Sequence, residues 1–277
     1  MEAHATVPGH VTGFFSVHQA SQPAKAGSRG AGIALQDGVT VSAKETPLEK
    51  VKLNGREATI EPVEYVLERF DSTVTVEIET QLPIGSGFGV SGAAALGTAL
   101  TAATVTEEYQ SEQELVRLSH VAEVKARTGL GDVVAQARGG VPVRIEPGAT
   151  GMLDGIPATQ RLEYITLGNL STAEILTGDT TTLSQAGENA LDRLLDSPTI
   201  EELFECSQEF AREADLYTPT VQEAIEAVHE NGGTAMMSML GQTVIALDRG
   251  LSNAGYDPAV TKIDHSGARL TQKSDDL

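Results

Sequence analysis

The stretch that decides how this sequence is interpreted reads Leu82-Pro83-Ile84-Gly85-Ser86-Gly87-Phe88-Gly89-Val90-Ser91-Gly92-Ala93-Ala94-Ala95. Glycine at positions 85, 87 and 89 lets backbone N–H groups come close to an anion. The alanine-rich segment that follows predicts a helix beginning near Ser91, and the N-terminal amides of a helix attract negative charge. The stretch therefore predicts a phosphate-binding loop at the start of a buried helix.

Two other phosphate-binding patterns have to be compared with this loop. It lacks the Gly-Lys-Ser/Thr of a Walker A motif. Gly87, Gly89 and Gly92 do form Gly-x-Gly-x-x-Gly, and Glu107 stands about where a dinucleotide-binding fold carries its ribose-binding carboxylate. No second parallel strand is evident before Glu107, so this pattern is weak evidence for a dinucleotide-binding fold. An NAD-binding oxidoreductase is therefore kept only as an alternative class.

Charge and composition exclude several partners. The chain has 39 acidic and 19 basic residues, a net charge of −20, which repels nucleic acids and anionic membranes. Residues 80–106 lack charged side chains, but proline and repeated glycines make a membrane span unfavourable there. A single cysteine, Cys206, and the absence of a signal-peptide pattern at the first residues favour the cytoplasm.

The acidity, with 4% aromatic residues and no tryptophan, is typical of a protein adapted to high salt. Molar salt screens repulsion between surface carboxylates, because the Debye length falls to about 3 Å. An ordinary acidic enzyme is the alternative.

Local patterns predict strands and helices along the whole chain. Ser111 and Glu114 form a capping box for a helix over 111–128 that ends at Gly129. Turn-forming residues at 146–151 place a boundary between two domains, 1–150 and 151–277. The other expected strands are 3–17, 31–43, 73–79, 141–145 and 162–167. The other expected helices are 133–137, 181–195, 200–214 and 219–229, and a hairpin is expected after the last of them.

Three motifs in this order resemble those of the GHMP kinases. Residues 83–93 resemble the central ATP-binding motif, residues 7–15 the N-terminal motif and residues 232–246 the C-terminal motif. Together they span nearly the whole chain. The resemblance implies a two-domain α+β fold, with an N-terminal domain like domain 2 of ribosomal protein S5 and a C-terminal ferredoxin-like domain.

Finer details separate branches of this superfamily. His10 stands where mevalonate kinases carry a lysine, which argues against that branch. Residues 8–15, 27–32 and 129–136 instead resemble the archaeal pantoate kinases, whose activity is the phosphorylation of the terminal hydroxyl of pantoate on the route to coenzyme A. The alternatives are a GHMP kinase for homoserine, shikimate or a mevalonate derivative, and a regulator that binds ATP without catalysis.

The resemblance implies ATP as co-substrate, Mg²⁺ as cofactor and pantoate as the other partner, and it allows a homodimer. Ser91 and Glu123 are the implied magnesium ligands, since hydroxyl and carboxylate oxygens suit a hard cation. The implied ATP-binding residues are Pro83, Gly85, Ser86, Gly87, Phe88, Gly89, Ser91, Gly92 and Ala93.

Asp132 matches the active-site aspartate of the family, which accepts or orients the proton of the substrate hydroxyl. His120 precedes Glu123 by three residues and therefore shares its helical face, as expected for a substrate contact. The pantoate carboxylate requires a cation, and Arg144 is favoured over Arg29. Ser28 and Thr180 are the weaker polar contacts expected for the substrate.

Each of these residues has an ordinary structural alternative. Ser91 or Asp132 would then only cap a helix, Glu123 would be a surface carboxylate, and the arginines would form surface ion pairs. Met236, Met237 and Met239 are expected in the core rather than at a metal, and Cys206 is expected to be a small buried hydrophobic residue.

Overall fold

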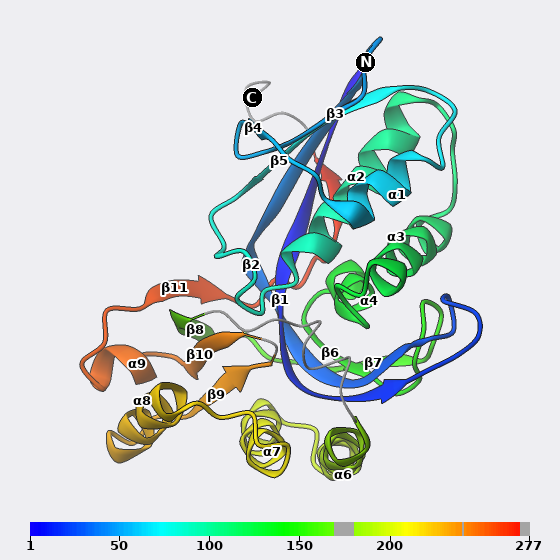
Figure 1. The fold of residues 1–277 in the computed structure, drawn as a ribbon. Helices are drawn as coiled ribbons and strands as arrows, with labels where there is room; N and C mark the ends of the chain where they lie inside the picture. The colour runs from blue at the N-terminus through cyan, green and yellow to red at the C-terminus, as the bar shows by residue number, and fades with distance from the viewer. Residues whose placement is uncertain (169–179, 240, 272–277) are drawn as a thin grey trace.

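The computed structural model describes residues 1–168, 180–239 and 241–271. A long antiparallel hairpin of β1 and β2 runs through the molecule and carries the first sheet (Figure 1). The path of this sheet is β12-β1-β2-β5-β3-β4, with β6 and β7 added beside β2. Its strands are β1 (Glu2–His18), β2 (Gly27–Glu45), β3 (Lys50–Leu53), β4 (Arg56–Glu57), β5 (Val74–Thr80), β6 (Val141–Arg144), β7 (Leu153–Ile156) and β12 (Arg269–Thr271).

Helices α1 (Glu61–Leu67), α2 (Val90–Val105), α3 (Glu112–Ala126) and α4 (Asp132–Arg138) lie together on one side of this sheet (Figure 1). The small residues of α2 allow it to pack closely against the strands: a Cβ atom at Gly97 would lie 2.4 Å from a methyl group of Val41 on β2. This close packing places the N-terminus of α2, and with it the glycine-rich loop, at the junction of the two sheets.

The second sheet has the order β11-β8-β10-β9, which, counted from β8, is fourth, first, third, second. All its pairings are antiparallel, as in a ferredoxin-like domain. Its strands are β8 (Arg161–Gly168), β9 (Ala235–Ser238), β10 (Gln242–Leu247) and β11 (Ala259–Lys262), and its helices are α6 (Thr181–Asp196), α7 (Ile200–Glu213), α8 (Pro219–Glu230) and α9 (Gly250–Asn253). The predicted α+β fold class is confirmed.

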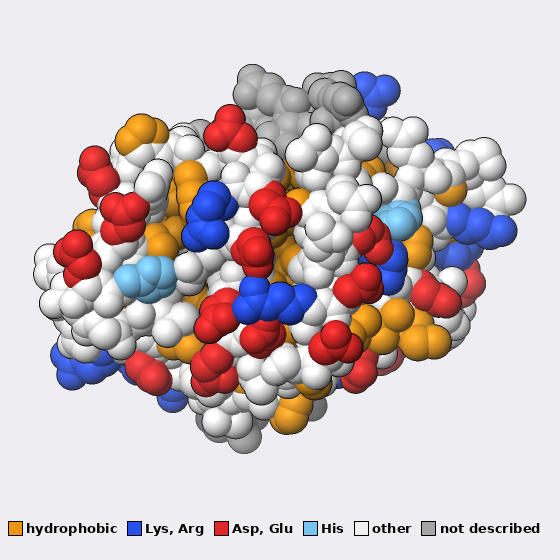
Figure 2. Space-filling model, turned by 90° about the horizontal axis from the view of Figure 1, so that it is seen from below, with side chains coloured by type: hydrophobic (Ala, Val, Ile, Leu, Met, Phe, Trp, Pro, Cys, Tyr) orange, Lys and Arg blue, Asp and Glu red, His pale blue; other side chains and the backbone are white. Residues whose placement is uncertain are grey.

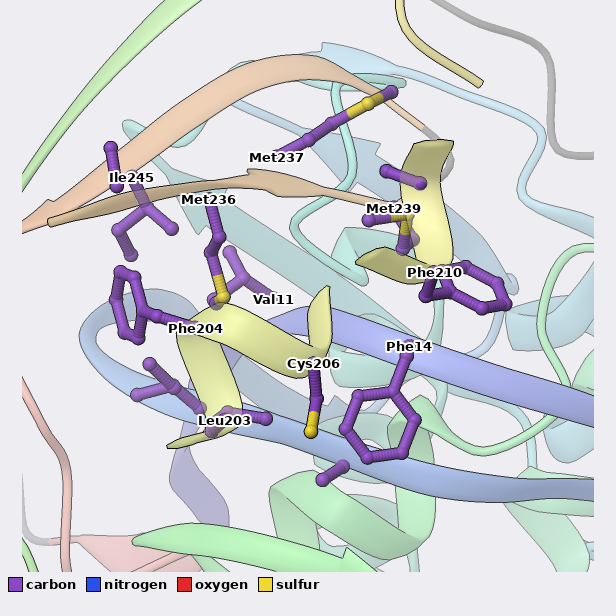
Figure 3. Packing of buried hydrophobic residues seen from close by; sticks show 14 of the residues in the cluster. Val11, Phe14, Leu203, Phe204, Cys206, Phe210, Met236, Met237, Met239 and Ile245 are labelled. Atoms are coloured by element: carbon purple, nitrogen blue, oxygen red, sulfur yellow. The ribbon is translucent and has the colours of Figure 1, made fainter. Parts of the chain in front are cut away.

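One hydrophobic cluster joins the two sheets. It includes Val11 and Phe14 from β1, Phe204 and Phe210 from α7, and the three methionines of the β9 region (Figure 3). Cys206 is buried in the same cluster, and burial raises the pKa of its thiol to about 12. The methionines and the cysteine are therefore core residues, as predicted.

The structure differs from the sequence-based expectations in several places. The helix from Glu112 ends at Ala126 rather than at Gly129, because Arg127 adopts the left-handed conformation that ends it (φ 58°). Several short elements were not predicted from the sequence: α1, β3, β4, β7, α9, β11 and β12. The two-domain division at residue 150 stays a prediction, although β7 and β12, both beyond it, hydrogen bond to β6 and β1.

The structure also bears on the oxidoreductase alternative and on the membrane span that the sequence made unfavourable. Strand β5, which precedes the glycine-rich loop, pairs antiparallel with β2, and its parallel partner β3 comes before it in the chain. A dinucleotide-binding fold instead requires a parallel strand that follows the loop and its helix. The oxidoreductase alternative is therefore wrong. Within the described ranges no helix is long and apolar enough to cross a bilayer.

The molecular surface is strongly acidic on the side of α6, α7 and α8, where carboxylates are spread among few basic groups (Figure 2). Arg193 on α6 contacts Glu205 and Glu209 on α7 at 2.8 and 2.6 Å. These pairs are solvated, and the side chain of Arg193 is 43% exposed.

Candidate active site

A cleft of about 340 Å³ opens at the start of α2. Its wall is formed by Ile84, Gly85 and residues 87–91 of the glycine-rich segment, together with Thr12 from β1, residues 126–128, Asp132 and Met239. Gly85, Gly87 and Gly89 have φ angles of 75°, 86° and 62°, the left-handed region that glycine tolerates best. The loop therefore needs glycine at these three positions to follow the wall of the cleft.

Four consecutive carbonyl groups of the loop are held by donors from other elements. Ser86 O accepts from Thr243 Oγ1 (2.8 Å), Gly87 O from Ser238 Oγ (2.7 Å), Phe88 O from the His10 amide (3.0 Å) and Gly89 O from Gln136 Nε2 (2.9 Å). In a planar trans peptide the next N–H group points away from the carbonyl oxygen. The amides of residues 87–90 are thus directed away from these donors, as an anion-binding loop requires.

The predicted ATP-binding residues fall into two groups. Gly85, Gly87, Phe88, Gly89 and Ser91 line the cleft. Pro83, Ser86, Gly92 and Ala93 lie outside its lining. The Phe88 ring is buried and packs edge-on against Tyr164 with 5.0 Å between ring centroids, so only its backbone can face a nucleotide.

Glu123 on α3 is a fully buried carboxyl group beside the loop. Burial raises its pKa to about 7, against hydrogen bonds from Thr128 and Ser91 that lower it. Its Oε1 accepts from Thr128 at 2.7 Å, whereas its buried Oε2 has no partner among the described residues. An unpartnered carboxylate oxygen next to a hydroxyl suits a hard cation, so Ser91 and Glu123 fit a magnesium ion.

These observations exclude two of the structural alternatives. Ser91 is not the N-cap of α2, since Gly89 occupies that position. Glu123 is not a surface carboxylate, because only 2% of it is exposed.

Asp132 is the first residue of α4, and its side chain, 19% exposed, lines the cleft. Its Oδ1 lies 2.7 Å from Nδ1 of the buried His10. Burial by itself would raise the pKa of Asp132, but the hydrogen bond from His10 and the positive charge of Arg144 outweigh it, and the pKa lies below its ordinary value. Asp132 is therefore a carboxylate at neutral pH.

Arg144 and Ser28 lie beside Gly131, the residue before Asp132. Arg144 Nη2 donates to Ser28 Oγ at 3.0 Å, and a Cβ atom at Gly131 would lie 2.6 Å from Arg144 Nε and 2.7 Å from Ser28 Oγ. Arg144 is 3% exposed, and within the described ranges it has no carboxylate within 4.0 Å. The charge of Asp132 is nearby but forms no ion pair with the guanidinium, and a buried cation that is only partly compensated favours an anionic ligand.

His120 is buried on the same side of α3 as Glu123, as predicted. Its Nε2 lies 2.8 Å from the carbonyl oxygen of Ala26, and burial, followed by the nearby charge of Arg144, lowers its pKa. His120 is therefore a neutral residue close to Arg144.

Arg29 and Thr180 lie elsewhere. Both line a second cavity, of about 510 Å³, with residues of β1 and α6. Arg29 Nη1 donates to Glu188 of α6, and its Nε donates to Ile145 O at 2.7 Å. Neighbouring residues of a strand face opposite sides of the sheet, which separates Arg29 from Ser28. The structure thus joins Ser28, His120 and Arg144 near Asp132, but not Arg29 or Thr180.

Sequence reasoning missed several residues around the loop. His10 was noted only as a departure from one kinase branch, and Gln136, Ser238 and Thr243 had no assigned role. All four lie within the motifs quoted above. Their roles depend on hydrogen bonds between segments far apart in the chain, and the sequence alone does not show which segments meet.

A loop with the geometry of an anion site at the start of a helix and an ionised aspartate in the same cleft are groups that phosphoryl transfer to a small molecule requires. Residues 58–140 match the model of the GHMP kinases N terminal domain. The chain is 36% identical to the pantoate kinase of Thermococcus kodakarensis, over 90% of this chain and 88% of that protein. It is 32% identical to the pantoate kinase of Methanocaldococcus jannaschii, over 87% and 91%.

A solved structure described as a phosphotransferase related to the CoA biosynthesis pathway superimposes with a TM-score of 0.86. It is 30% identical in sequence, and the match covers 98% of this chain and 99% of that one. The chain belongs to the pantoate kinase family of the GHMP kinases.

Proposed function

We propose that this protein transfers the γ-phosphoryl group of ATP to the terminal hydroxyl of pantoate, forming 4-phosphopantoate for coenzyme A biosynthesis. The names of the relatives support this substrate. The observation that carries the proposal is the buried Arg144 beside Ser28 and Asp132, since pantoate offers both a carboxylate for the guanidinium and a hydroxyl for Asp132.

Each residue of the site has a distinct role in this proposal. The amides of residues 87–90 bind the phosphates of ATP, and Arg144 with Ser28 binds the carboxylate of pantoate. His120 contacts the same substrate. Asp132 orients the terminal hydroxyl and accepts its proton as the hydroxyl oxygen bonds to the γ-phosphorus and ADP leaves.

Ser91 and Glu123 would hold Mg²⁺, which when bound neutralises charge on the β- and γ-phosphates. Arg29 and Thr180 would act on substrate only through the second cavity, at a distance from Asp132. Pro83, Ser86, Gly92 and Ala93 would support the loop from behind rather than contact the nucleotide.

The composition supports a cytoplasmic protein of a salt-adapted cell. Its net charge of −20 and its single cysteine are compatible with a reducing, salt-rich interior.

Release of ADP in the presence of pantoate, pantothenate, homoserine, shikimate and mevalonate tests the substrate. We expect activity with pantoate, and activity with another acceptor but none with pantoate would overturn the proposal. The Arg144→Gln variant should raise the KM for pantoate about 10-fold or more while the KM for ATP changes little. Arg193→Gln, which removes an exposed arginine on α6, is the matched control.

A further inference from the structure

His10 and Asp132 form a partly buried pair, of which the proposed reaction uses only Asp132. Nδ1 of His10 on β1 lies 2.7 Å from Oδ1 of Asp132 on α4. The imidazole is fully buried, whereas the carboxylate side chain is 19% exposed toward the cleft. His10 therefore lies behind Asp132, on the side away from solvent.

The surroundings of the ring determine which nitrogen carries the proton. A carboxylate only accepts hydrogen bonds, so Nδ1 must carry the hydrogen. Nε2 is buried and has no partner among the described residues. It faces Gly32 of β2, where a Cβ atom would lie 2.4 Å from it. A proton on Nε2 would be buried without an acceptor, which disfavours the imidazolium.

The electrostatics agree with this arrangement. Burial lowers the pKa of His10 despite the nearby carboxylate, and the charge of Arg144 lowers it further. His10 is consequently a neutral donor and leaves the negative charge of Asp132 unneutralised.

The bond from His10 also makes the two oxygens of Asp132 unequal. Oδ1 is engaged by Nδ1. Oδ2 is directed toward the segment before α4, since a Cβ atom at Gly129 would lie 3.3 Å from Oδ2 and 2.2 Å from Oε2 of Glu123. Oδ2, which is not engaged by His10, is left to receive a hydroxyl proton on the side of Glu123.

We propose that His10 is a positioning residue for phosphoryl transfer: as the neutral Nδ1–H tautomer it holds Oδ1 of Asp132, so that Oδ2 faces the substrate hydroxyl. The inference rests on the proposed kinase function. His10 itself contacts neither substrate nor nucleotide. Its backbone amide, which holds Phe88 O, is retained in every side-chain variant, so nucleotide binding should be insensitive to the imidazole.

Asparagine and glutamine at position 10 carry the same amide group, so comparing them shows whether the location of the side-chain N–H group matters. In His10→Asn the side-chain amide places its N–H near the position of Nδ1, whereas in His10→Gln it places it near the position of Nε2. We expect His10→Gln and His10→Ala to lower kcat about 10- to 100-fold, with KM for pantoate and ATP within about 3-fold. His10→Asn should recover about 10-fold over His10→Gln. His265→Gln, which changes an exposed histidine, is the control.

Equal losses in His10→Asn and His10→Gln, or losses confined to KM, would overturn the proposal. A second measurement does not need turnover: ¹⁵N–¹H NMR of histidine-labelled protein, with His10→Ala for assignment, should show His10 as the Nδ1–H tautomer. An Nε2–H or doubly protonated ring would contradict the inference. If the wild type fails to phosphorylate pantoate, the proposed function fails, while the tautomer still reports on the His10–Asp132 pair.

Discussion

Replacing Glu123 by glutamine should make the metal-free protein more stable above neutral pH while removing its activity. The pKa of Glu123 rises from 4.5 to about 7 because the carboxyl group is buried. Between these two values the folded state holds a proton that the unfolded state releases, so the free energy of unfolding falls as pH rises. At 1.36 kcal/mol per pKa unit the loss amounts to about 3 kcal/mol, complete above about pH 7.

The glutamine side chain avoids this loss because it is neutral at every pH. Its carbonyl can still accept the hydrogen bond that Thr128 donates to Oε1. Its new N–H group lies in the same region as Oε1 of Gln136, which has no partner among the described residues, since both this atom and Oε2 of Glu123 are close to the Cβ position at Gly92, at 3.2 and 3.4 Å. The variant therefore adds a donor near an acceptor that has no partner within the described part of the chain.

Urea denaturation followed by circular dichroism, at constant KCl and with a chelator of divalent cations, measures the effect. The difference in unfolding free energy between Glu123→Gln and the wild type should grow by about 3 kcal/mol from pH 4.5 to pH 8. Glu223→Gln, on the exposed side of α8, should change stability by less than about 0.5 kcal/mol. A pH-independent difference, or one that shrinks as pH rises, would refute the reasoning.

Three other predictions concern the loop, the aspartate and the surface. Asp132→Asn should lower kcat about 10²- to 10⁴-fold and leave the Kd for ATP, measured by calorimetry, within about 3-fold; unchanged turnover would favour the non-catalytic alternative. Thr243→Val removes the donor that holds Ser86 O and should raise the KM for ATP about 5- to 10-fold, whereas Thr104→Val on α2 should not. The Tm should rise from 0.1 to 2 M KCl, and no rise would favour the ordinary acidic enzyme.

Local patterns were sufficient to predict most of the fold. The predicted N-cap is present, since Ser111 accepts from the amide of Glu114, whereas the Glu114 carboxylate accepts from Arg117. The small residues of α2 mark a helix that packs closely on a sheet. Strand β12 was not predicted because its three residues gain their stability from pairing with β1, more than 250 positions earlier in the chain, and only the tertiary structure provides that pairing.

The candidate site was predictable to the extent that motif residues carry their own chemistry. The loop follows from residue type and local position, whereas the roles expected of Asp132 and Glu123 came from the resemblance to the GHMP kinases. Arg29 and Ser28 are neighbours in one strand, and the two-residue period of a strand already indicates that they face opposite sides. The pairing of His10 with Asp132 was not predictable, because it joins residues 122 positions apart through a sheet and a helix that pack only in the folded chain.

The net charge of −20 has a different meaning once the site is known. ATP and pantoate are both anions, so the protein as a whole repels them. The groups that would bind them are of another kind: loop amides, whose carbonyls are held from behind, and Arg144, which is 3% exposed. Buried charges are screened by salt much less than surface charges. High salt therefore suppresses the repulsion outside the cleft and leaves the attraction inside it largely intact, so that an acidic surface and a site for two anions are compatible in one chain.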